Sequence, residues 1–213
     1  MASSNANLFI VAAPSGAGKS SLISALLQRA QEGHLLNAAQ LSVSHTTRLP
    51  REGEVNGEHY HYITVEQFTQ MVLQEAFYEH AKVFENYYGT SRVAISDKLS
   101  RGIDVLLDID WQGARQIKKI NPEVVSIFIL PPSKEELYAR LVSRGSDSDS
   151  VIDSRMKQAQ QEMSHYTEFD YVIVNDNFTD ALEQLITIVK SHSLGLAQQQ
   201  VRHKDLLASL LKK

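Results

Sequence analysis

The stretch Leu8-Phe-Ile-Val-Ala-Ala-Pro-Ser-Gly-Ala-Gly-Lys-Ser-Ser21 joins an apolar run to a glycine-rich loop and the start of a periodic segment. Its first five residues, 8–12, predict a buried strand, and the apolar residues between Leu22 and Ala30 recur at the spacing of one helix face. A strand, a glycine loop, Lys-Ser and a helix in this order are typical of a phosphate-binding P-loop. The backbone N–H groups of such a loop and the positive end of the helix dipole both attract phosphate.

Two side chains at the start of the predicted helix suit phosphate chemistry. Lys19 can reach the β- and γ-phosphates of a nucleotide, and the Ser20 hydroxyl can ligate Mg²⁺. The general P-loop pattern has glycine where this chain has Ala13, so Ala13 must keep a negative φ. The alternative is a plain strand–turn–helix corner with an incidental Lys-Ser pair, which the agreement of spacing and context disfavours.

The composition bounds the class of protein. A chain of 213 residues with 43% hydrophobic residues suits one large folded domain with small insertions. The formal net charge of −4 argues against a general nucleic-acid binder, which carries a basic excess. No apolar run approaches membrane-spanning length, and residues 1–7 lack the features of a secretory signal. The absence of cysteine excludes disulfides and thiolate zinc sites and is compatible with a cytoplasmic location.

Five apolar runs separated by helical segments predict an α/β fold with a five-stranded parallel sheet. The runs are residues 8–12, 41–44, 104–108, 124–130 and 171–174. Residues 45–90 differ because their strand-like runs are short, and we predict that they form an inserted mixed α/β subdomain. Within it, Asn56-Gly57 predicts a hairpin and Asn86-Tyr-Tyr-Gly89 predicts a turn. Residues 196–213 predict a further amphipathic helix within a C-terminal extension, 193–213.

Asp108 and Asp110 lie where the third of these runs ends. Strand alternation places both carboxylates on one side, with Ile109 opposite. Beside a P-loop, an acid at this place can hold Mg²⁺ directly or through water. The alternative is a solvated strand end, which the nearby P-loop disfavours.

Arg140, Arg144 and Arg155 form a second group. Arg140 and Arg144 are four residues apart and share a helix face, while Arg155 follows the small polar stretch 145–150. Cations on a mobile segment can close over phosphates, supply the charge that phosphoryl transfer needs and exclude water. A basic helix face in water is the alternative, and composition alone favours it.

Arg48, Arg51, Tyr60 and Tyr88 lie within the predicted insert. Two guanidinium groups and two phenols can bind one phosphate dianion. The alternative for the tyrosines is packing within a hairpin, with their hydroxyls exposed.

Glu79 stands in an otherwise apolar stretch, and a partly buried carboxylate needs a partner. Guanine offers two adjacent donors, N1–H and the exocyclic amine, which one carboxylate can accept together. Adenine has an acceptor at N1, so the same carboxylate would repel it. The hydroxyls of Ser44 and Thr90 can donate to guanine O6. A local salt bridge of Glu79 is the alternative that the sequence leaves open.

Several longer motifs resemble the signatures of the guanylate kinase family in its bacterial form. The motifs are Ser44-His-Thr-Thr-Arg48, then Arg51, Gly53-Glu-Val-Asn-Gly57, Glu79, Asn86-Tyr-Tyr-Gly-Thr90, Asp108-Ile-Asp-Trp-Gln-Gly113 and Val172-Ile-Val-Asn-Asp176. The resemblance covers about residues 7–192. It implies phosphoryl transfer from ATP to GMP, with Mg²⁺, giving ADP and GDP. It also implies three parts: a P-loop NTPase core (1–44 and 91–192), a GMP-binding insert (45–90) and a small helical lid (about 140–156).

The resemblance assigns roles to the candidate residues. It implies that ATP is bound by the P-loop and by one asparagine near adenine: Ala13, Pro14, Ser15, Gly16, Ala17, Gly18, Lys19, Ser20, Ser21 and Asn175. It implies that GMP contacts Ser44, Arg48, Arg51, Tyr60, Glu79, Tyr88, Thr90 and Asp110. We expect the catalytic groups to be Lys19, Arg48, Asp110, Arg140, Arg144 and Arg155. We expect the Mg²⁺ ligands to be Ser20 and Asp108.

Two other functions stay open at the level of sequence. A guanylate-kinase-like module of a scaffold protein keeps the phosphate pocket for phosphopeptides but has lost catalysis, whereas Lys19, Ser20 and the three arginines are all present here. A kinase for another phosphorylated sugar or nucleotide is the third hypothesis, and Glu79 with Ser44 argues against it. The extension 193–213 is a candidate for contacts in a homo-oligomer.

Overall fold

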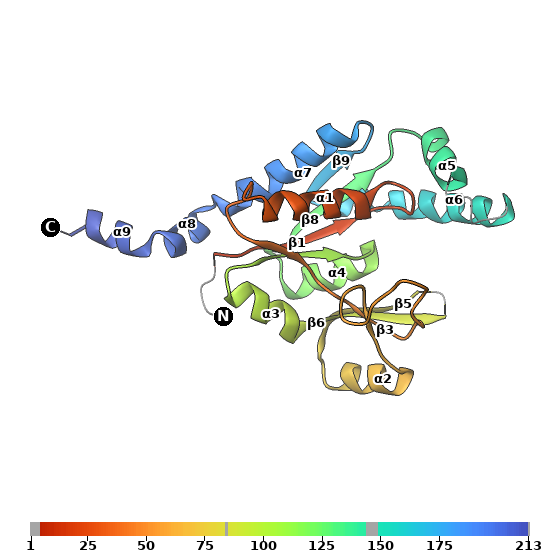
Figure 1. The fold of residues 1–213 in the computed structure, drawn as a ribbon, viewed down its shortest axis with the longest axis horizontal. Coiled ribbons are helices and arrows are strands. Elements are labelled where there is room, and N and C mark those ends of the chain that lie inside the picture. The colour runs from red at the N-terminus through yellow and green to blue at the C-terminus, as the bar shows by residue number, and fades with distance from the viewer. Residues whose placement is uncertain (1–4, 84, 144–148, 213) are drawn as a thin grey trace.

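The α/β core is built on a five-stranded parallel sheet (Figure 1). The computed structural model describes residues 5–83, 85–143 and 149–212. Along the sheet the strands are β2 (Ala39–Leu41), β7 (Asp104–Asp108), β1 (Leu8–Ala12), β8 (Val125–Leu130) and β9 (Tyr171–Val174). The predicted sheet is therefore confirmed, although its second strand lies at 39–41 instead of 41–44.

The central strand β1 explains why the sequence specifies this sheet. It pairs in parallel with β7 on one side and β8 on the other, so that Ile10 lies beside both Leu107 and Ser126. Phe9, Ile10 and Val11 are fully buried, as expected for a parallel strand covered on both faces. A continuous apolar run, without alternation, is the sequence pattern of such a strand.

Helices cover both faces of the sheet (Figure 1). On one face α1 (Lys19–Gln31) packs beside α7 (Phe178–Ser193), and both contribute to one buried cluster. On the other face α3 (Arg92–Ser100) and α4 (Trp111–Ile120) contribute Ile95 and Ile117 to a second cluster. Two of these helices, α1 and α4, directly follow the P-loop and the end of β7, so their packing on the sheet positions both segments.

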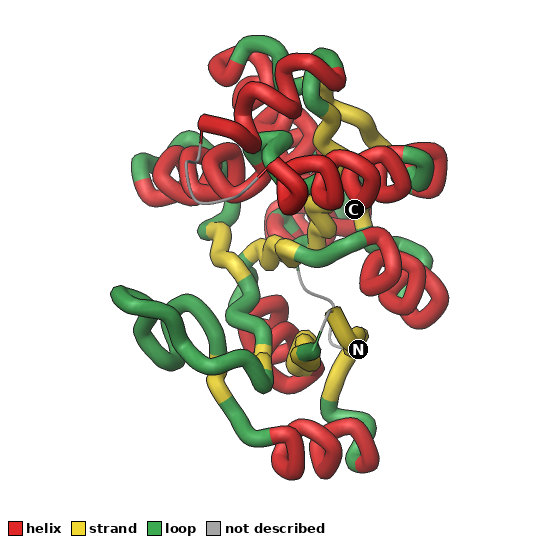
Figure 2. The backbone as a smooth tube through the Cα atoms, turned by 90° about the vertical axis from the view of Figure 1, so that its right-hand side faces the viewer, coloured by secondary structure: helices red, strands yellow, loops and turns green. Residues whose placement is uncertain are grey.

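The insert is a separate layer that lies below the core in Figure 2. Its four-stranded sheet has the order β4 (His61–Tyr62), β3 (His45–Thr46), β6 (Asn86–Ser91) and β5 (Phe77–Val83). Helix α2 (Val65–Leu73) begins at the capping box of Thr64 and Gln67 and stacks Phe68 on Phe77 of β5. Strands β5 and β6 are antiparallel, and the C-terminal end of β6 leads directly into α3.

Two local predictions within the insert are wrong. The Asn56-Gly57 segment makes no hairpin, because β3 and β4 run parallel and Asn56 forms an isolated parallel bridge with Tyr60. Gly57 instead donates its N–H to the Tyr60 carbonyl at 2.8 Å, in a short local loop. Residues 86–89 belong to strand β6 and not to a turn, because β3 and β5 pair with them from both sides.

The predicted lid, about 140–156, covers the end of α5 (Lys134–Ser143) and the first half of α6 (Asp149–Met163). They share a small buried cluster formed by Leu137, Leu141, Ile152 and Ala159. A short 3-10 turn, Tyr166–Glu168, leads from α6 toward β9. Arg144 and most of the polar stretch 145–150 lie outside the described residues.

The C-terminal extension forms two short helices instead of one, α8 (Leu196–Arg202) and α9 (Lys204–Leu210). Helix α8 is tied to the core, since Gln198 donates to Asn7 Oδ1 at 2.9 Å and Arg202 donates to Asn37 Oδ1 at 2.7 Å. Helix α9 projects away from the body (Figure 1). Within the described part of the chain, no helix combines the length and apolar character that crossing a membrane requires.

Candidate active site

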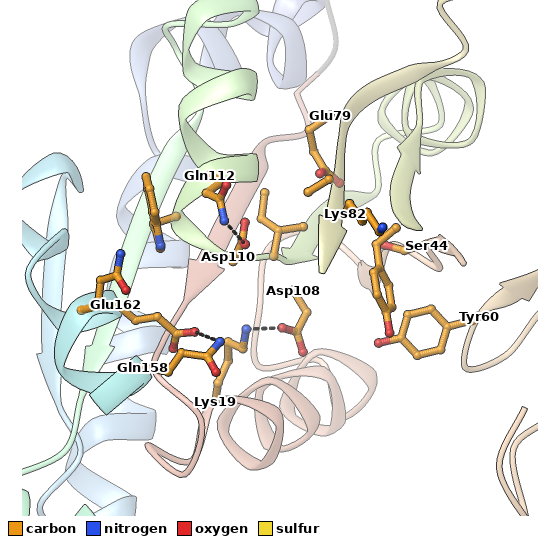
Figure 3. Close-up of a pocket in the computed structure, with 15 residues that line it drawn as sticks. Lys19, Ser44, Tyr60, Glu79, Lys82, Asp108, Asp110, Gln112, Gln158 and Glu162 are labelled. Carbon is orange, nitrogen blue, oxygen red and sulfur yellow. Dashed lines mark hydrogen bonds and ion pairs between the residues drawn. The ribbon is translucent and has the colours of Figure 1, made fainter. Parts of the chain in front are cut away.

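A cavity of about 510 Å³ opens where the carboxyl ends of β1 and β7 face the insert and helix α6 (Figure 3). Predicted site residues from both halves of the molecule line it together: Lys19, Ser44, Tyr60, Glu79, Tyr88, Asp108 and Asp110. Residues that the sequence did not single out complete the lining: Ala81, Lys82, Ile109, Trp111, Gln112, Gln158, Gln161 and Glu162.

The loop between β1 and α1 has the backbone that a P-loop needs. Gly16 and Gly18 have φ values of +93° and +92°, in the left-handed region that favours glycine. Among the described non-glycine residues only Glu75 has a positive φ. Ala13 therefore has the negative φ that an alanine at this loop position requires. Helix α1 then starts at Lys19, which directs its positive N-terminal end toward the loop.

Lys19 and Asp108 form an ion pair at one side of the cavity. The sheet register places Val11 beside Asp108, so the strand-end acid lies next to the P-loop. The Lys19 Nζ to Asp108 Oδ1 distance is 2.5 Å, and the two side chains are 19% and 32% exposed. Asp110 follows as the N-cap of α4, where its Oδ1 accepts from the Gly113 N–H at 2.8 Å. That cap fixes the second acid at the cavity wall.

Glu79 is the buried acid on the insert side of the cavity. Its side chain is only 5% exposed, and Thr90 donates its hydroxyl to Glu79 Oε1 at 2.5 Å. Burial raises the pKa of Glu79 to about 7; the Thr90 hydrogen bond lowers this pKa, and the charge of Asp110 raises it further. Among the described contacts, a hydroxyl and not a cation holds this carboxylate, so the salt-bridge alternative is not seen.

Arg48 lies in an aromatic and acidic cluster of the insert. Its Nη2 meets Glu54 Oε1 at 2.8 Å, and its guanidinium lies 5.5 Å from the ring centroid of Tyr60. Hydrogen bonding from Arg48 is the largest cause that lowers the pKa of Glu54 to about 2. Tyr60 and Tyr88 meet edge to face, with ring centroids 5.9 Å apart. Three of the four predicted phosphate ligands are therefore neighbours.

The remaining predicted residues lie outside the cavity lining. Arg51 is exposed, and its backbone N–H donates to Glu54 Oε2 at 2.7 Å. Arg140 of α5 pairs with Glu136 at 2.8 Å, and Arg155 lies on α6. Asn175 is 4% exposed and contacts the P-loop backbone.

Helix α6 contributes side chains that sequence reasoning missed. Gln158, Gln161 and Glu162 lie on one face of α6 and line the cavity. Figure 3 shows Gln158 and Glu162 pointing into it. Gln158 donates to Glu162 Oε1 at 3.2 Å. Burial raises the pKa of Glu162, while the charge of Lys19 opposes that shift. Polar residues on a helix surface are common. The only signal in the sequence was the spacing of three and four residues, which places Gln158, Gln161 and Glu162 on the same face of a helix.

The match to a known family model spans residues 5–192 and carries the description guanylate kinase. The chain belongs to the guanylate kinase family. It is 57% identical over 209 residues to the guanylate kinase of Shewanella denitrificans, covering 98% of this chain and 99% of that protein. It is 57% identical over 204 residues to the guanylate kinase of Escherichia coli K12, covering 96% and 97%. The crystal structure of guanylate kinase from Anaplasma phagocytophilum superposes with a TM-score of 0.75 at 31% identity, covering 99% and 98% of the two chains.

The likeness to members of the guanylate kinase family continues beyond the residues that the family model matches. The guanylate kinase of Pseudoalteromonas translucida is 56% identical over 212 residues, with 100% of each chain covered. The extension 193–213 is therefore shared with this relative, although it lies outside the matched range 5–192. The polar contacts of α8 with Asn7 and Asn37 give that segment a structural place in the fold.

Proposed function

We propose that this protein transfers the γ-phosphoryl group of ATP to GMP, giving ADP and GDP. The observation that carries the proposal is the shared cavity, in which Lys19 of the P-loop faces the same space as Glu79 and Tyr88 of the insert. Two substrates that react in line need two adjoining sites, and the core and the insert supply one each. The family membership of the chain and its relatives' identities of about 57% support the same reaction.

On the donor side, the loop 13–21 would bind the phosphates of ATP. The helix N-terminus and the loop N–H groups attract the phosphates. Lys19 would stabilise the negative charge that develops during transfer. In this structure Lys19 is neutralised by Asp108, so bound phosphates would compete with this carboxylate for the ammonium group. The pair is partly exposed, and such pairs contribute about 0–1 kcal/mol, so the exchange is inexpensive.

On the acceptor side, Glu79 would read guanine. Its carboxylate can accept the N1–H and the exocyclic amine together, while adenine N1 would face it as a second acceptor. Ser44 and Thr90 hydroxyls would complete the base site, and Arg48, Arg51, Tyr60 and Tyr88 would hold the GMP phosphate. Asp110, fixed as the cap of α4, lies in the same cavity.

Mg²⁺ is the metal that the residues fit. This cation keeps several waters and takes one or two protein oxygens beside the substrate phosphates. Ser20 at the start of α1 and Asp108 at the end of β7 would supply these oxygens. Among the described residues, no group of three or more His, Asp or Glu side chains is placed to hold a metal ion. When bound, it would neutralise negative charge on the phosphates.

The catalytic groups that we propose are Lys19, Arg48, Asp110, Arg140, Arg144 and Arg155. Phosphoryl transfer asks for positioning and charge stabilisation, and little covalent work is left for the protein. Arg140 and Arg155 lie outside the cavity lining here, so we expect the lid and the insert to close over the bound substrates. Closure would bring these guanidinium groups to the transferring phosphate and exclude water.

We place the enzyme in the cytoplasm, acting on ATP and GMP without nucleic-acid or membrane partners.

Helix α9 exposes Leu206, Leu210 and Leu211, which are 53%, 69% and 82% accessible, and an apolar face of this kind suits a homo-oligomer. Sedimentation velocity of the wild type and of a Leu206→Lys, Leu210→Lys variant tests this contact. A wild type that stays monomeric at micromolar concentration would contradict it.

The alternative is a phosphopeptide-binding module without catalysis. It is not favoured, because a binding module needs neither Lys19 at the P-loop nor an acid at the end of β7. A coupled assay of ADP release with GMP, AMP or CMP separates the two functions. We expect turnover with GMP and little with the other two. Quenching of Trp111, the single tryptophan, by GMP without any ADP release would instead support the binding module.

A further inference from the structure

Asn175, directly after β9, contacts the backbone of the P-loop. Its backbone N–H donates to the Leu130 carbonyl at 2.8 Å, which fixes the residue to the sheet. Its side-chain Nδ2 donates to the Ala17 carbonyl at 2.7 Å, a contact between residues 158 positions apart in the chain. Asn175 is 4% exposed, so this hydrogen bond to the loop satisfies a donor of a buried amide.

The contact orients a peptide group of the P-loop. In a trans peptide the carbonyl and the following N–H point in opposite directions. Because Ala17 O faces Asn175, the Gly18 N–H must point away from Asn175. The loop binds phosphate through such N–H groups, so their directions decide its affinity. Asn175 thus sets the direction of one of them from behind the loop.

Asn175 packs so closely against Gly18 that a side chain at position 18 would collide with it. A Cβ atom on Gly18 would lie 2.3 Å from Asn175 Nδ2, which is far inside a normal contact. The positive φ of Gly18 adds a second reason for glycine at this position. The loop backbone and the asparagine amide therefore form one packed unit.

The same residue also contacts the predicted lid. The Asn175 backbone carbonyl accepts from Arg140 Nη2 at 3.1 Å, and Arg140 Nε meets Glu136 at 2.8 Å. The side chain of Asn175 thus holds the P-loop while its backbone receives an arginine of α5.

We propose that Asn175 is a positioning residue for the phosphate-binding backbone of the P-loop and not a reader of adenine. The inference rests on the proposed function, in which this loop binds the phosphates of ATP. The amide donor acts through Ala17 and Gly18, so its removal should weaken every ligand that carries the phosphate chain, with or without a base.

The test compares ATP with inorganic tripolyphosphate, which carries no base, by titration calorimetry in Mg²⁺ buffer. The variants are Asn175→Ala, which removes the amide, and Asn175→Asp, which has the same shape but places an acceptor against the Ala17 carbonyl. We expect both ligands to lose affinity by the same factor, about 10-fold, with GMP binding unchanged.

Asn177→Ala is the matched control, two residues along the chain. Asn177 caps α7 by accepting from the N–H groups of Thr179 at 2.9 Å and Asp180 at 3.2 Å. Its loss should lower the melting temperature and leave tripolyphosphate affinity unchanged. The control shows whether reduced stability by itself affects phosphate binding.

Three results would overturn the inference. Weaker ATP binding with unchanged tripolyphosphate binding would make Asn175 a base contact. Unchanged binding of both ligands by both variants would remove Asn175 from the donor site. A wild type that fails to bind tripolyphosphate and ATP would overturn the P-loop assignment itself, together with this inference.

Discussion

The carboxylate of Glu79 gives a sharp test, because one substitution should raise stability and lower function together. Glu79 is 5% exposed, and burial raises its pKa to about 7 from an ordinary value of 4.5. Glutamine has nearly the same shape and can still accept the Thr90 hydroxyl, but it carries no charge. Glu79→Gln therefore removes the cost of a buried charge without opening a cavity.

The magnitude follows from the two pKa values. A difference between 4.5 and about 7, at about 1.4 kcal/mol per pKa unit, corresponds to about 3 kcal/mol. The folded pKa is the higher one, so the stabilising effect of protonation is complete below pH 4.5 and is lost as the pH rises through 7. At pH 8 the glutamine variant should exceed the wild type by up to about 3 kcal/mol, and at pH 5 by less than about 1 kcal/mol.

Thermal unfolding at pH 5 and pH 8 measures this difference. For a chain of this size, about 3 kcal/mol corresponds to a rise of about 6–12 °C in Tm at pH 8. Glu183→Gln is the control, since it removes the same charge from the exposed face of α7. A glutamine variant of Glu79 that gains the same Tm at both pH values, or loses stability at pH 8, would refute the reasoning.

Four further outcomes follow from the site. Glu79→Gln should weaken GMP binding by about 30- to 100-fold, since one of the two guanine donors loses its charged acceptor, while AMP binding should not weaken; equal losses for both would contradict a base-reading role. Lys19→Ala should lower kcat by about 100-fold or more with little change in the Kd of GMP, measured by Trp111 quenching. Gly18→Ala should abolish tripolyphosphate binding and retain GMP binding, because its Cβ would meet Asn175 at 2.3 Å. Glu162→Gln should tighten tripolyphosphate several-fold, because it removes a negative charge that interacts with Lys19 and so competes with phosphate for that ammonium group; an unchanged Kd in calorimetry would exclude that competition.

Much of the core could be predicted because its signals are local. Continuous apolar runs marked the buried strands, and the Thr64–Gln67 capping box marked the start of α2. The turn predicted at residues 86–89 failed because Asn and Gly also occur in strands, and pairing with β3 and β5 decides the outcome. Pairing partners lie up to tens of residues away, where no short pattern records them.

The site shows the same division. The P-loop is one continuous stretch, so Lys19 and its glycines could be found from spacing. The contact of Asn175 and the position of Glu162 near Lys19 could not be predicted, because Ala17 and Lys19 lie more than 140 positions earlier in the chain. Resemblance located Asn175 near the donor site, and only the fold shows that its amide is directed at the loop backbone.

The two halves of the cavity differ in how their charged side chains are held, and the roles that we propose for the two halves follow from this difference. Lys19 and Asp108 are partly exposed and paired, so their contact is readily exchanged for nucleotide phosphate. Glu79 is buried with a hydroxyl as its partner, so its ionised form is costly until two further donors arrive. In the proposed site, guanine would supply both donors and thereby relieve a cost that the folded protein already bears. A base without them would leave that cost in place, so the proposed role of Glu79 assigns selectivity for the acceptor to this residue and not to the donor loop.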